Sequence, residues 1–222
     1  MDGQIIRAGI RGSTRTEGLD SRPSFAYGSV YDPANTHFGL LLACNEERLA
    51  DGAGFPEHPH RDVEVLTWVV SGVLRHVDDA GHTGEARPGV VQRMSAGGGV
   101  RHSEHAVGGP AHYVQMWIRP ATFGQAPAYD TVPVGPGLTE VSPLRQPDAT
   151  LVAGRLPAGR AVTLGPAAYL HLLVVDGTVL VDGTALGPGD ALRRADAGPT
   201  GVVAGTGAEL LAWRMRSGLS VG

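Results

Sequence analysis

Two pairs of potential metal ligands stand in the first half of the chain, each with a spacing of two residues. The stretch EHPHRDVE holds His58 and His60 on either side of Pro59, and the stretch AGGGVRHSEHA holds His102 and Glu104. Residues two apart on a β-strand point to the same face, whereas on a helix they diverge by about 200°. If both pairs lie on strands inside a barrel, all four side chains can face one ion.

Three imidazoles and one carboxylate form a ligand set of nitrogen and oxygen alone. Such a set suits Fe(II), Mn(II), Ni(II) or Cu(II), and in octahedral geometry it leaves two positions open for water, substrate or dioxygen. Open positions favour chemistry over a purely structural role. Zinc is compatible with these ligands, although structural zinc sites are usually closed and rich in sulfur.

The alternatives at this site are chance and a different carboxylate. Nine histidines in 222 residues produce about 0.4 His-x-His pairs by chance, so the first pair alone is a weak motif. Glu64 shares the strand parity of His58 and His60 and is the rival carboxylate, unless a bulge at Pro59 breaks that parity. Because proline cannot donate a ladder hydrogen bond, Pro59 predicts an edge strand, a bulge or the start of a strand.

The other histidines have plainer interpretations. His105 follows Glu104 and so faces away from His102 on a strand. The glycine run at 96–99 predicts a tight turn rather than a phosphate loop, because it precedes a strand and lacks lysine. Cys44 adjoins an apolar run and is interpreted as a small buried hydrophobe. Four histidines are expected at turns or strand ends as hydrogen-bonded polar residues: His37, His76, His82 and His112.

Composition excludes several classes of protein. Cys44 is the only cysteine, so an intrachain disulfide and a thiolate zinc cluster are both ruled out. The net charge is -4 and the basic residues are scattered, which argues against nucleic acid as a direct partner. All the basic residues are arginines, so no lysine can form a Schiff base or a P-loop contact. With no apolar run of membrane-helix length and no secretory leader, we expect a cytoplasmic protein without a membrane partner.

The pattern of short apolar runs predicts an all-β fold. The chain has 33 glycines and 16 prolines, and the segments between them are short and rich in Val, Leu and Thr. This is typical of many-stranded antiparallel proteins. No amphipathic helix longer than about ten residues is expected. The clearest predicted strands are 63–70, 113–118, 169–175 and 209–215.

The chain also repeats itself, which predicts two copies of one β unit. A Pro-rich stretch from 121 to 137 suits a linker, so we predict two domains, 1–125 and 126–222. The corresponding residues are 69–72 with 174–177, Pro88-Gly89 with Pro188-Gly189, and Trp117 with Trp213.

Together, these motifs closely resemble the pirin family of the cupin superfamily. The resemblance rests on GFPEHPHRDVEVLTWVVSG, HTGEARPGVVQRMSAGGGVRHSE and AHYVQMWIRP, and extends back through YDPANTHFG and CNEERLADGAGF. It covers roughly the first 120 residues, with departures at Val90 and Gly98, neither of which is a ligand position. The resemblance implies a bicupin fold, two jelly-roll-type antiparallel β-barrels in one chain.

The resemblance also implies a ligand set. Pirins bind one metal, usually iron, in the N-terminal barrel, and the family pattern falls on His58, His60, His102 and Glu104. It therefore favours Glu104 over Glu64. The second barrel retains only His171, so we expect that barrel to be degenerate and metal-free.

Two functions from different classes follow from the resemblance. The first is that of the bacterial pirin-like quercetin 2,3-dioxygenases, in which an iron-dependent enzyme cleaves flavonols with release of carbon monoxide. Glu104 would accept the proton of the substrate hydroxyl. The alternative is a redox-sensing regulator, which would use the same metal and act through protein partners. A small aromatic substrate is the expected partner in the first case, and a regulatory protein in the second.

Overall fold

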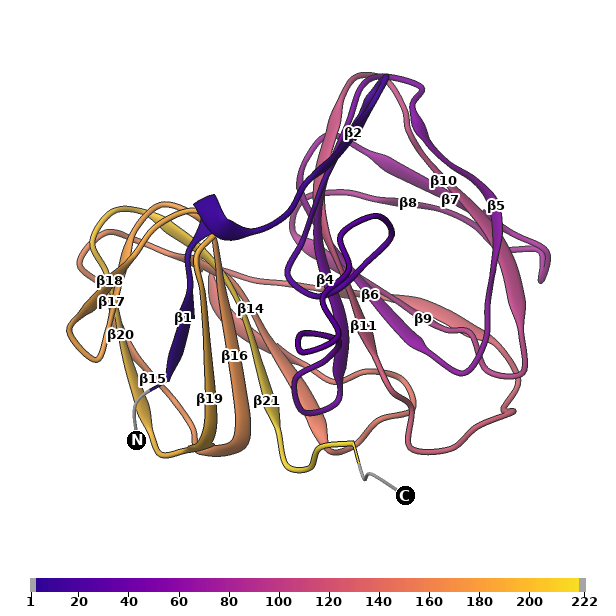
Figure 1. Cartoon of the computed structure of the whole chain (residues 1–222). Coiled ribbons are helices and arrows are strands. Elements are labelled where there is room, and N and C mark those ends of the chain that lie inside the picture. The colour runs from indigo at the N-terminus through magenta and orange to yellow at the C-terminus, as the bar shows by residue number, and fades with distance from the viewer. Residues whose placement is uncertain (1–2, 220–222) are drawn as a thin grey trace.

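The computed structural model describes residues 3–219, and nearly all of its regular structure is β. One 3-10 helix, η1, spans Ala8–Ile10. Among the described residues, no helix has the length and apolar character that crossing a membrane requires. Every strand pairing within this part of the chain is antiparallel. The strands form two lobes, which lie side by side in Figure 1.

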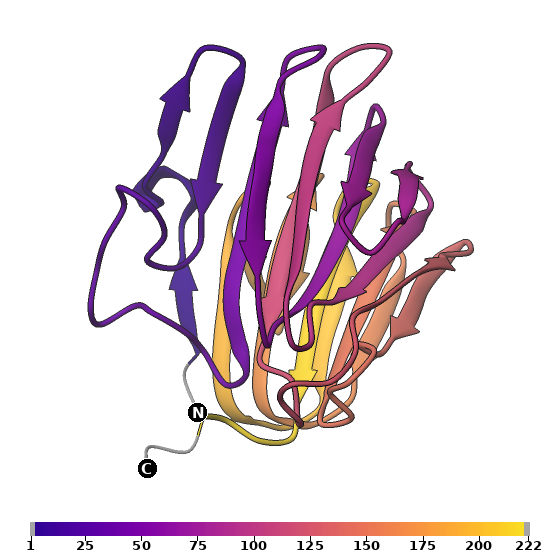
Figure 2. The same cartoon turned by 90° about the vertical axis from the view of Figure 1, so that its right-hand side faces the viewer.

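The first lobe, coloured mainly indigo to magenta, consists of two facing sheets. One sheet has seven strands in the order β12-β9-β6-β11-β4-β3-β2, and the other has four in the order β5-β10-β7-β8. Figure 2 shows this lobe in front of the second. Its strands are β2 Thr14–Thr16, β3 Leu19–Pro23, β4 Leu41–Leu49, β5 Gly54–His60, β6 Glu64–Ser71, β7 Leu74–Asp78, β8 Thr83–Ala86, β9 Val90–Ser95, β10 Val100–Ala106, β11 Ala111–Ile118 and β12 Ala128–Pro133.

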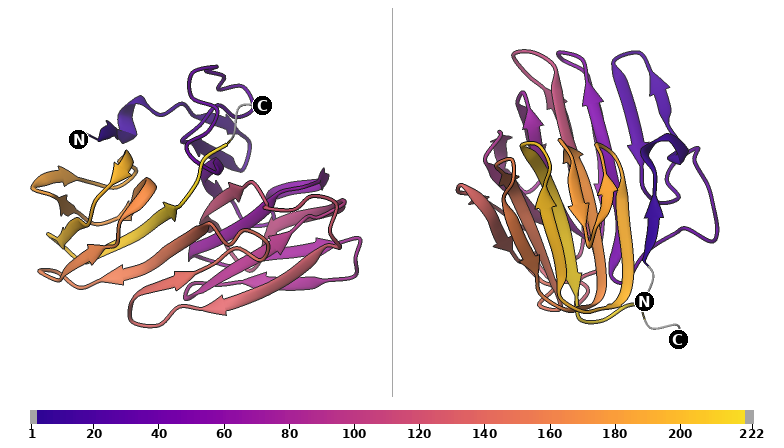
Figure 3. Two further views of the ribbon diagram at one scale, coloured as in Figure 1. Left: turned by 90° about the horizontal axis from the view of Figure 1, so that it is seen from below. Right: turned by 90° about the vertical axis from the view of Figure 1, so that its left-hand side faces the viewer.

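The second lobe repeats this arrangement, with a six-stranded sheet in the order β1-β19-β16-β21-β14-β13 and a four-stranded sheet in the order β15-β20-β17-β18. The left panel of Figure 3 shows the two lobes side by side from below. Residues of their larger sheets pack against each other in a shared core. Its strands are β1 Gln4–Ile6, β13 Gly137–Val141, β14 Ala149–Leu156, β15 Ala161–Leu164, β16 Ala167–Asp176, β17 Val179–Val181, β18 Thr184–Leu186, β19 Ala191–Ala197, β20 Thr200–Ala204 and β21 Ala208–Met215.

The larger sheets are buried on both faces, which explains their continuous apolar runs. On β16, Leu172 packs inside the second lobe, whereas its neighbour Leu173 packs into the core between the lobes. Trp68 of β6 and Trp213 of β21 enter that same inter-lobe core, and both are about 99–100% buried. Successive side chains point to opposite faces of a strand, so one apolar run can serve two cores.

The predicted strands and the predicted repeat are both confirmed. The four sequence segments singled out as strands correspond to β6, β11, β16 and β21. The repeated glycines occupy equivalent turns: Gly72 and Gly177 have φ of 79° and 72°. At both positions a Cβ atom would lie within 2.2 Å of a backbone oxygen, so only glycine fits. The two jelly-roll lobes of this bicupin therefore have the same glycine turn at equivalent positions, as a repeated β unit predicts.

Strand pairing crosses the predicted boundary at residue 125 in both directions. The N-terminal strand β1 pairs with β19 and lies among the orange strands of the second lobe in Figure 1. Conversely, β12 follows residue 125 but pairs with β9 of the first lobe. β1 completes the larger sheet of the second lobe, and β12 completes the larger sheet of the first. A division of the chain at residue 125 would therefore remove one strand from each lobe. The division into domains 1–125 and 126–222 stays a prediction.

Candidate metal centre

The candidate ligands line up across three adjacent strands of the four-stranded sheet. His102 lies on the central strand β10, directly opposite His58 on β5. Its other neighbour, β7, places His76 opposite Glu104. Because β10 is hydrogen-bonded on both sides, its two ligand candidates have fixed neighbours. The sheet itself therefore assembles the site from side chains that the chain separates by more than 40 residues.

Three imidazoles meet at the centre of this group. The Nε2 atoms of His58 and His102 are 3.0 Å apart. The ring of His60 lies 4.9 Å from that of His58 and 4.8 Å from that of His102, measured between centroids. One potential ligand atom from each of these histidines falls within 4.8 Å of the others. A second, overlapping group of this kind contains His76, His102 and Glu104.

Of the three positions predicted for Pro59, namely an edge strand, a bulge or the start of a strand, the structure shows an edge strand. Strand β5 is the edge of its sheet, and Pro59 is in regular register with Arg101. The bulge lies earlier, because His102 pairs with His58 while Glu104 pairs with Phe55. The parity of the two β5 histidines is therefore intact, and both rings face the same group.

Glu104 is buried and oriented by a neighbouring amide. It is 1% exposed, and its Oε2 accepts a 2.7 Å hydrogen bond from Gln115 Nε2. The other oxygen, Oε1, has no hydrogen-bond partner among the described residues. Gln115 is itself held by Trp117, whose Nε1 donates to Gln115 Oε1 at 3.2 Å. Burial raises the pKa of Glu104 to about 7, and the Gln115 hydrogen bond opposes that rise.

His76 is the residue of this site that sequence reasoning missed. It was expected at a turn or strand end, yet it is fully buried on β7, with its Nδ1 3.0 Å from the Nδ1 of His102. Its Nε2 lies 3.0 Å from Asp78 Oδ2. The expectation that its polar atoms are satisfied is confirmed, but the expectation of a turn or strand end is wrong, because His76 is the middle residue of β7. The spacing of His76 and Asp78 on one strand face was the available signal.

The remaining sequence candidates lie elsewhere. Glu64 is buried, but its Oε2 accepts the Arg145 backbone N–H at 2.9 Å, and it belongs to neither ligand group among residues 3–219. His171 is fully buried on β16 of the second lobe and also lies outside both groups. His105 pairs with Arg75 and is part-exposed. His37 and His82 are exposed, and His112 bonds Glu46 at 3.0 Å.

Aromatic rings surround the histidine cluster. Trp117 meets His60 edge to face at 5.0 Å, and Phe55 meets His58 at 6.2 Å. Tyr129 stacks at a tilt on His76 at 5.0 Å, although it lies on β12, beyond the predicted boundary. Rings of this kind exclude water and give planar surfaces for an aromatic ligand. A strand that was assigned by sequence to the second domain thus contributes to the first lobe's site.

The environment favours neutral imidazoles. Burial, followed by the neighbouring imidazoles, lowers the pKa of His60 to about 4 and that of His102 to about 2. Neutral imidazole is the form that binds a metal. The cluster is therefore ready to bind a cation at neutral pH without first losing protons from these two rings.

The residues present fit a divalent ion. The Nε2 of His60 and the Oε1 of Glu104 are buried without a hydrogen-bond partner in the described chain. The Nδ1–H of His58 donates a hydrogen bond to the Pro56 carbonyl at 2.8 Å, so its other nitrogen, Nε2, is the potential ligand and faces His102. Two nitrogens at right angles on one ion, with bonds of about 2.1 Å, would be about 3.0 Å apart. His76 fits less well as a ligand, because both of its nitrogens already have partners.

A second buried carboxylate lies near Glu104. Glu47 on β4 is 3% exposed and accepts a 2.8 Å hydrogen bond from Ser21 Oγ. Burial and, to a smaller extent, the negative charge of Glu104 raise the pKa of Glu47 to about 8, while the Ser21 hydrogen bond opposes that rise. An ion with two positive charges at the histidine cluster would favour ionised carboxyls in this interior.

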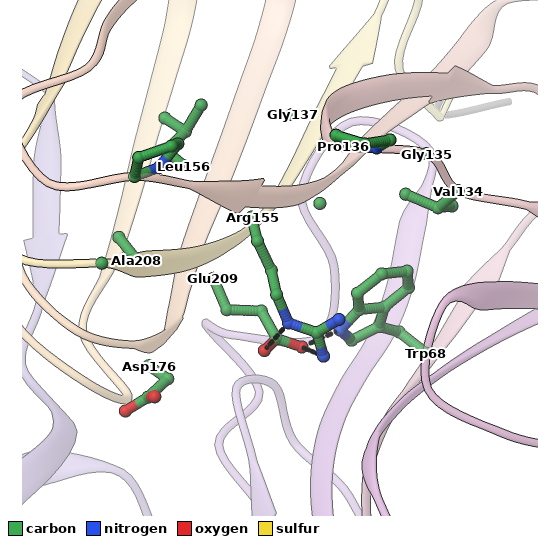
Figure 4. Close-up of a pocket in the computed structure, with 13 residues that line it drawn as sticks. Trp68, Val134, Gly135, Pro136, Gly137, Arg155, Leu156, Asp176, Ala208 and Glu209 are labelled. Atoms are coloured by element: carbon green, nitrogen blue, oxygen red, sulfur yellow. Dashed lines mark hydrogen bonds and ion pairs between the residues drawn. The ribbon is translucent and has the colours of Figure 1, made fainter.

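A cavity of about 660 Å³ lies away from this cluster, between the lobes. Figure 4 shows the Arg155 guanidinium in it, directed at Glu209 and Trp68. Arg155 donates from Nε and Nη2 to Glu209 at 2.9 and 3.1 Å, and Trp68 Nε1 donates to the same carboxylate. The carboxylate is thus fully used in joining β6, β14 and β21, so this ion pair connects the lobes.

Two jelly-roll lobes, one of which gathers histidines and a carboxylate on a single sheet, define a bicupin with one potential metal centre. The pirin family model matches residues 7–118, and the chain belongs to the pirin family. A protein of Mycobacterium tuberculosis strain H37Rv, named "Putative quercetin 2,3-dioxygenase", is 41% identical over 234 residues, covering 97% of this chain and 96% of that protein.

Two comparisons with Escherichia coli, one of sequence and one of structure, extend this result. Quercetin 2,3-dioxygenase of strain K12 is 37% identical over 128 residues, which cover 57% of this chain and 55% of that protein. The structure of the bacterial pirin YhhW in complex with nickel(II) superposes with a TM-score of 0.91 at 29% identity, over 97% of this chain and all of that one. The predictions of family and fold are therefore confirmed.

Proposed function

We propose that this protein is a metal-dependent dioxygenase that cleaves flavonols such as quercetin, with one Fe(II) held by His58, His60, His102 and Glu104. The observation that supports this proposal most directly is the group of His58, His60 and His102, whose potential ligand atoms lie within 4.8 Å of one another, with Glu104 joined to it through the overlapping group that shares His102. The names of the relatives support the reaction, and the nickel(II) complex of the Escherichia coli pirin supports a divalent ion.

When bound, the ion supplies Lewis acidity toward the substrate hydroxyl and one-electron chemistry with dioxygen. The chain supplies the rest. Glu104 Oε1, which has no hydrogen-bond partner among the described residues, would both hold the ion and take the hydroxyl proton, while Gln115 fixes the orientation of the carboxylate through Oε2. Trp117 and Tyr129 give the flavonol flat apolar walls and keep bulk water away from the proton transfer.

The approach of substrate is set by burial. His60, His102 and Glu104 are 1–8% exposed, whereas His58 on the edge strand is half-buried. We infer that the flavonol enters beside His58, because the other three side chains are closed off by the two sheets. An edge strand has one free side, so it can admit a ligand without disturbing the ladder that holds β10.

Oxygen uptake tests the proposal. Protein loaded anaerobically with Fe(II) should consume dioxygen when quercetin is added, with one carbon monoxide released per dioxygen, and metal-free protein should consume none. If fully loaded protein consumes no oxygen with any flavonol, the enzymatic proposal fails. A metal-dependent interaction with a regulatory protein, which needs the same ligands but no turnover, then takes its place.

A further inference from the structure

Arg193 places a buried positive charge in the second lobe without a negative partner. Its side chain lies on β19, and the residue is only 6% exposed. No carboxylate of residues 3–219 is within 4.0 Å of its guanidinium, which instead lies 4.0 Å from the ring centroid of Phe25. Buried charges are normally paired, because an uncompensated one costs several kcal/mol. The ring of Phe25 offsets a part of that cost.

The hydrogen bonds of Arg193 leave most of its donors free. Nη1 donates to Asn35 Oδ1 at 2.6 Å and Nη2 donates to the Ser24 carbonyl at 2.7 Å. Nε is buried without an acceptor in the described chain. A guanidinium carries five N–H groups, so three of them have no acceptor among residues 3–219. Arginine forks of this kind match the oxygens of carboxylates and phosphates.

A second buried guanidinium stands nearby. The side chain of Arg11 is 2% exposed, and its Nη1 is 3.5 Å from Glu46 Oε2. That carboxylate is shared with Arg48 at 2.7 Å and His112 at 3.0 Å. Burial and the charge of Arg11 both lower the pKa of Arg193, to about 10. Arg11 is therefore paired only with a carboxylate that has two other partners, and Arg193 has no carboxylate partner among the described residues, which leaves an excess of positive charge.

A cavity of about 380 Å³ brings these groups together. Arg11, Arg193, Asn35 and Phe25 are among its lining residues, so it is formed by the segment after η1, the loop between β3 and β4, and β19. Asp32 also lines it, but Asp32 is exposed, and its Oδ1 accepts the Ala34 N–H at 2.9 Å. None of the lining residues belongs to the histidine cluster. The cavity is thus an independent concave site with buried cationic walls.

We propose that this cavity binds a small anion through a carboxylate or phosphate group, held by Arg193 and Arg11. The anion supplies the missing counter-charge and accepts the free N–H groups of Arg193. Arg11 contributes its charge and its Nε–H, because its Nη1 and Nη2 already donate to the carbonyls of Gly189 and Arg22. Since the walls come from the N-terminal segment, a first-lobe loop and a second-lobe strand, the bound anion also joins the two lobes. Its effect should therefore appear in the stability of the whole protein.

Thermal unfolding of the full chain tests this site. Inorganic phosphate and, separately, acetate are titrated at constant ionic strength, with sodium chloride as the balancing salt. At ten times Kd, the anion that binds should raise Tm by about 3–6 °C. The arm that responds identifies phosphate or carboxylate as the recognised group. If neither anion raises Tm beyond chloride, the proposal is overturned.

Three variants sharpen the test. Arg193→Met should abolish the anion-dependent rise, whereas Arg160→Met, which removes an exposed arginine before β15, should retain it. Asn35→Asp places a carboxylate 2.6 Å from Arg193 Nη1 with almost no change of shape, at the cost of the hydrogen bond that Asn35 Nδ2 donates to the Ser24 carbonyl at 3.1 Å. This variant should be more stable than wild type without anion and should no longer respond to one. If Arg193→Met does not fold, the test rests on Asn35→Asp. A rise in the Tm of this variant with anion that equals the rise of wild type would contradict the proposed site.

Discussion

The Nε2 atoms of His58 and His102 lie 3.0 Å apart, although 44 residues separate them in the chain. This contact exists because β5 and β10 pair in a register that places the two residues directly opposite each other. A one-residue slip would turn every side chain of β5 to the other face. The site therefore depends on strand register as much as on residue identity, and the extra residue of the β5 bulge lies just before His58.

The first prediction concerns metal content. His58→Ala and His102→Ala should each bind the ion at least about 10–100-fold more weakly than wild type, because each removes a nitrogen that no other residue replaces. His105→Ala is the matched control on the same strand, since that ring faces away from the group. Elemental analysis after dialysis at equal free metal measures the difference. Full metal retention by either variant would exclude that histidine as a ligand.

Much of this site was predictable from sequence, for a simple geometric reason. Two-residue spacing on strands fixes side-chain direction, so His58, His60, His102 and Glu104 could be grouped before any coordinates. Register between strands is not encoded in that spacing. His76 could therefore not be assigned to the site from sequence, because its closeness to His102 depends on the pairing of β7 with the side of β10 opposite to β5.

The exchange of strands between lobes was also hidden. β1 and β12 are short, and nothing in their own sequence distinguishes the sheet of one lobe from that of the other. Their partners are chosen by tertiary packing, which overrides local preference. Tyr129 belongs to the site only through this exchange, since β12 pairs with β9. The burial of Arg193 could not be predicted for the same reason, because the sequence of its strand does not indicate which side chains pack against it.

The second prediction concerns the chain of contacts from Asp78 through His76 to His102. If His102 binds the ion through Nε2, its Nδ1–H donates to His76, whose Nε2–H donates to Asp78. His76→Leu should weaken metal binding about 10–100-fold by removing this support. It should also change the EPR spectrum of the Cu(II)-loaded protein, which reports ligand orientation. His82→Ala, which touches Asp78 only from the exposed side, should change neither.

The third prediction concerns pH and the metal-free protein. His60 and His102 have folded pKa values of about 4 and about 2, so the unfolded chain binds more protons below about pH 6.5 and stability falls with falling pH. Glu47 and Glu104 have folded pKa values of about 8 and about 7, so the folded chain binds more protons between about pH 4.5 and those values, and stability falls with rising pH.

Together these opposite slopes place the stability maximum of the metal-free protein between about pH 4.5 and 6.5. Metal binding needs deprotonated ligands, so the metal-loaded protein should instead be most stable above about pH 7. Differential scanning calorimetry across pH 4–9, with and without metal, measures both maxima. A metal-free maximum above pH 8 would show that the buried carboxyls are not protonated.

The fourth prediction isolates one of those carboxyls. Glu47→Gln keeps an acceptor for Ser21 Oγ and removes the buried charge. In metal-free protein it should raise the free energy of unfolding by about 1–3 kcal/mol at pH 8.5 and change it little at pH 4.5, where both side chains are neutral. Urea titrations at the two pH values measure the difference. An equal effect at both would assign the change to packing rather than to charge.

The last prediction is catalytic. Glu104→Gln retains the shape of the side chain but removes the base, and a positioned base contributes about 10²–10⁴-fold to rate. We expect kcat per bound metal to fall within that range while KM for quercetin changes little, because the aromatic walls that bind the ring are untouched. Some metal loss is also expected, since an anionic ligand becomes neutral, so rates are compared per bound ion. Gln115→Leu, which frees Glu104 Oε2 but leaves the carboxylate, is the companion variant and should lower kcat less. Normal turnover per metal in Glu104→Gln would leave the enzyme proposal standing but would remove Glu104 as its base.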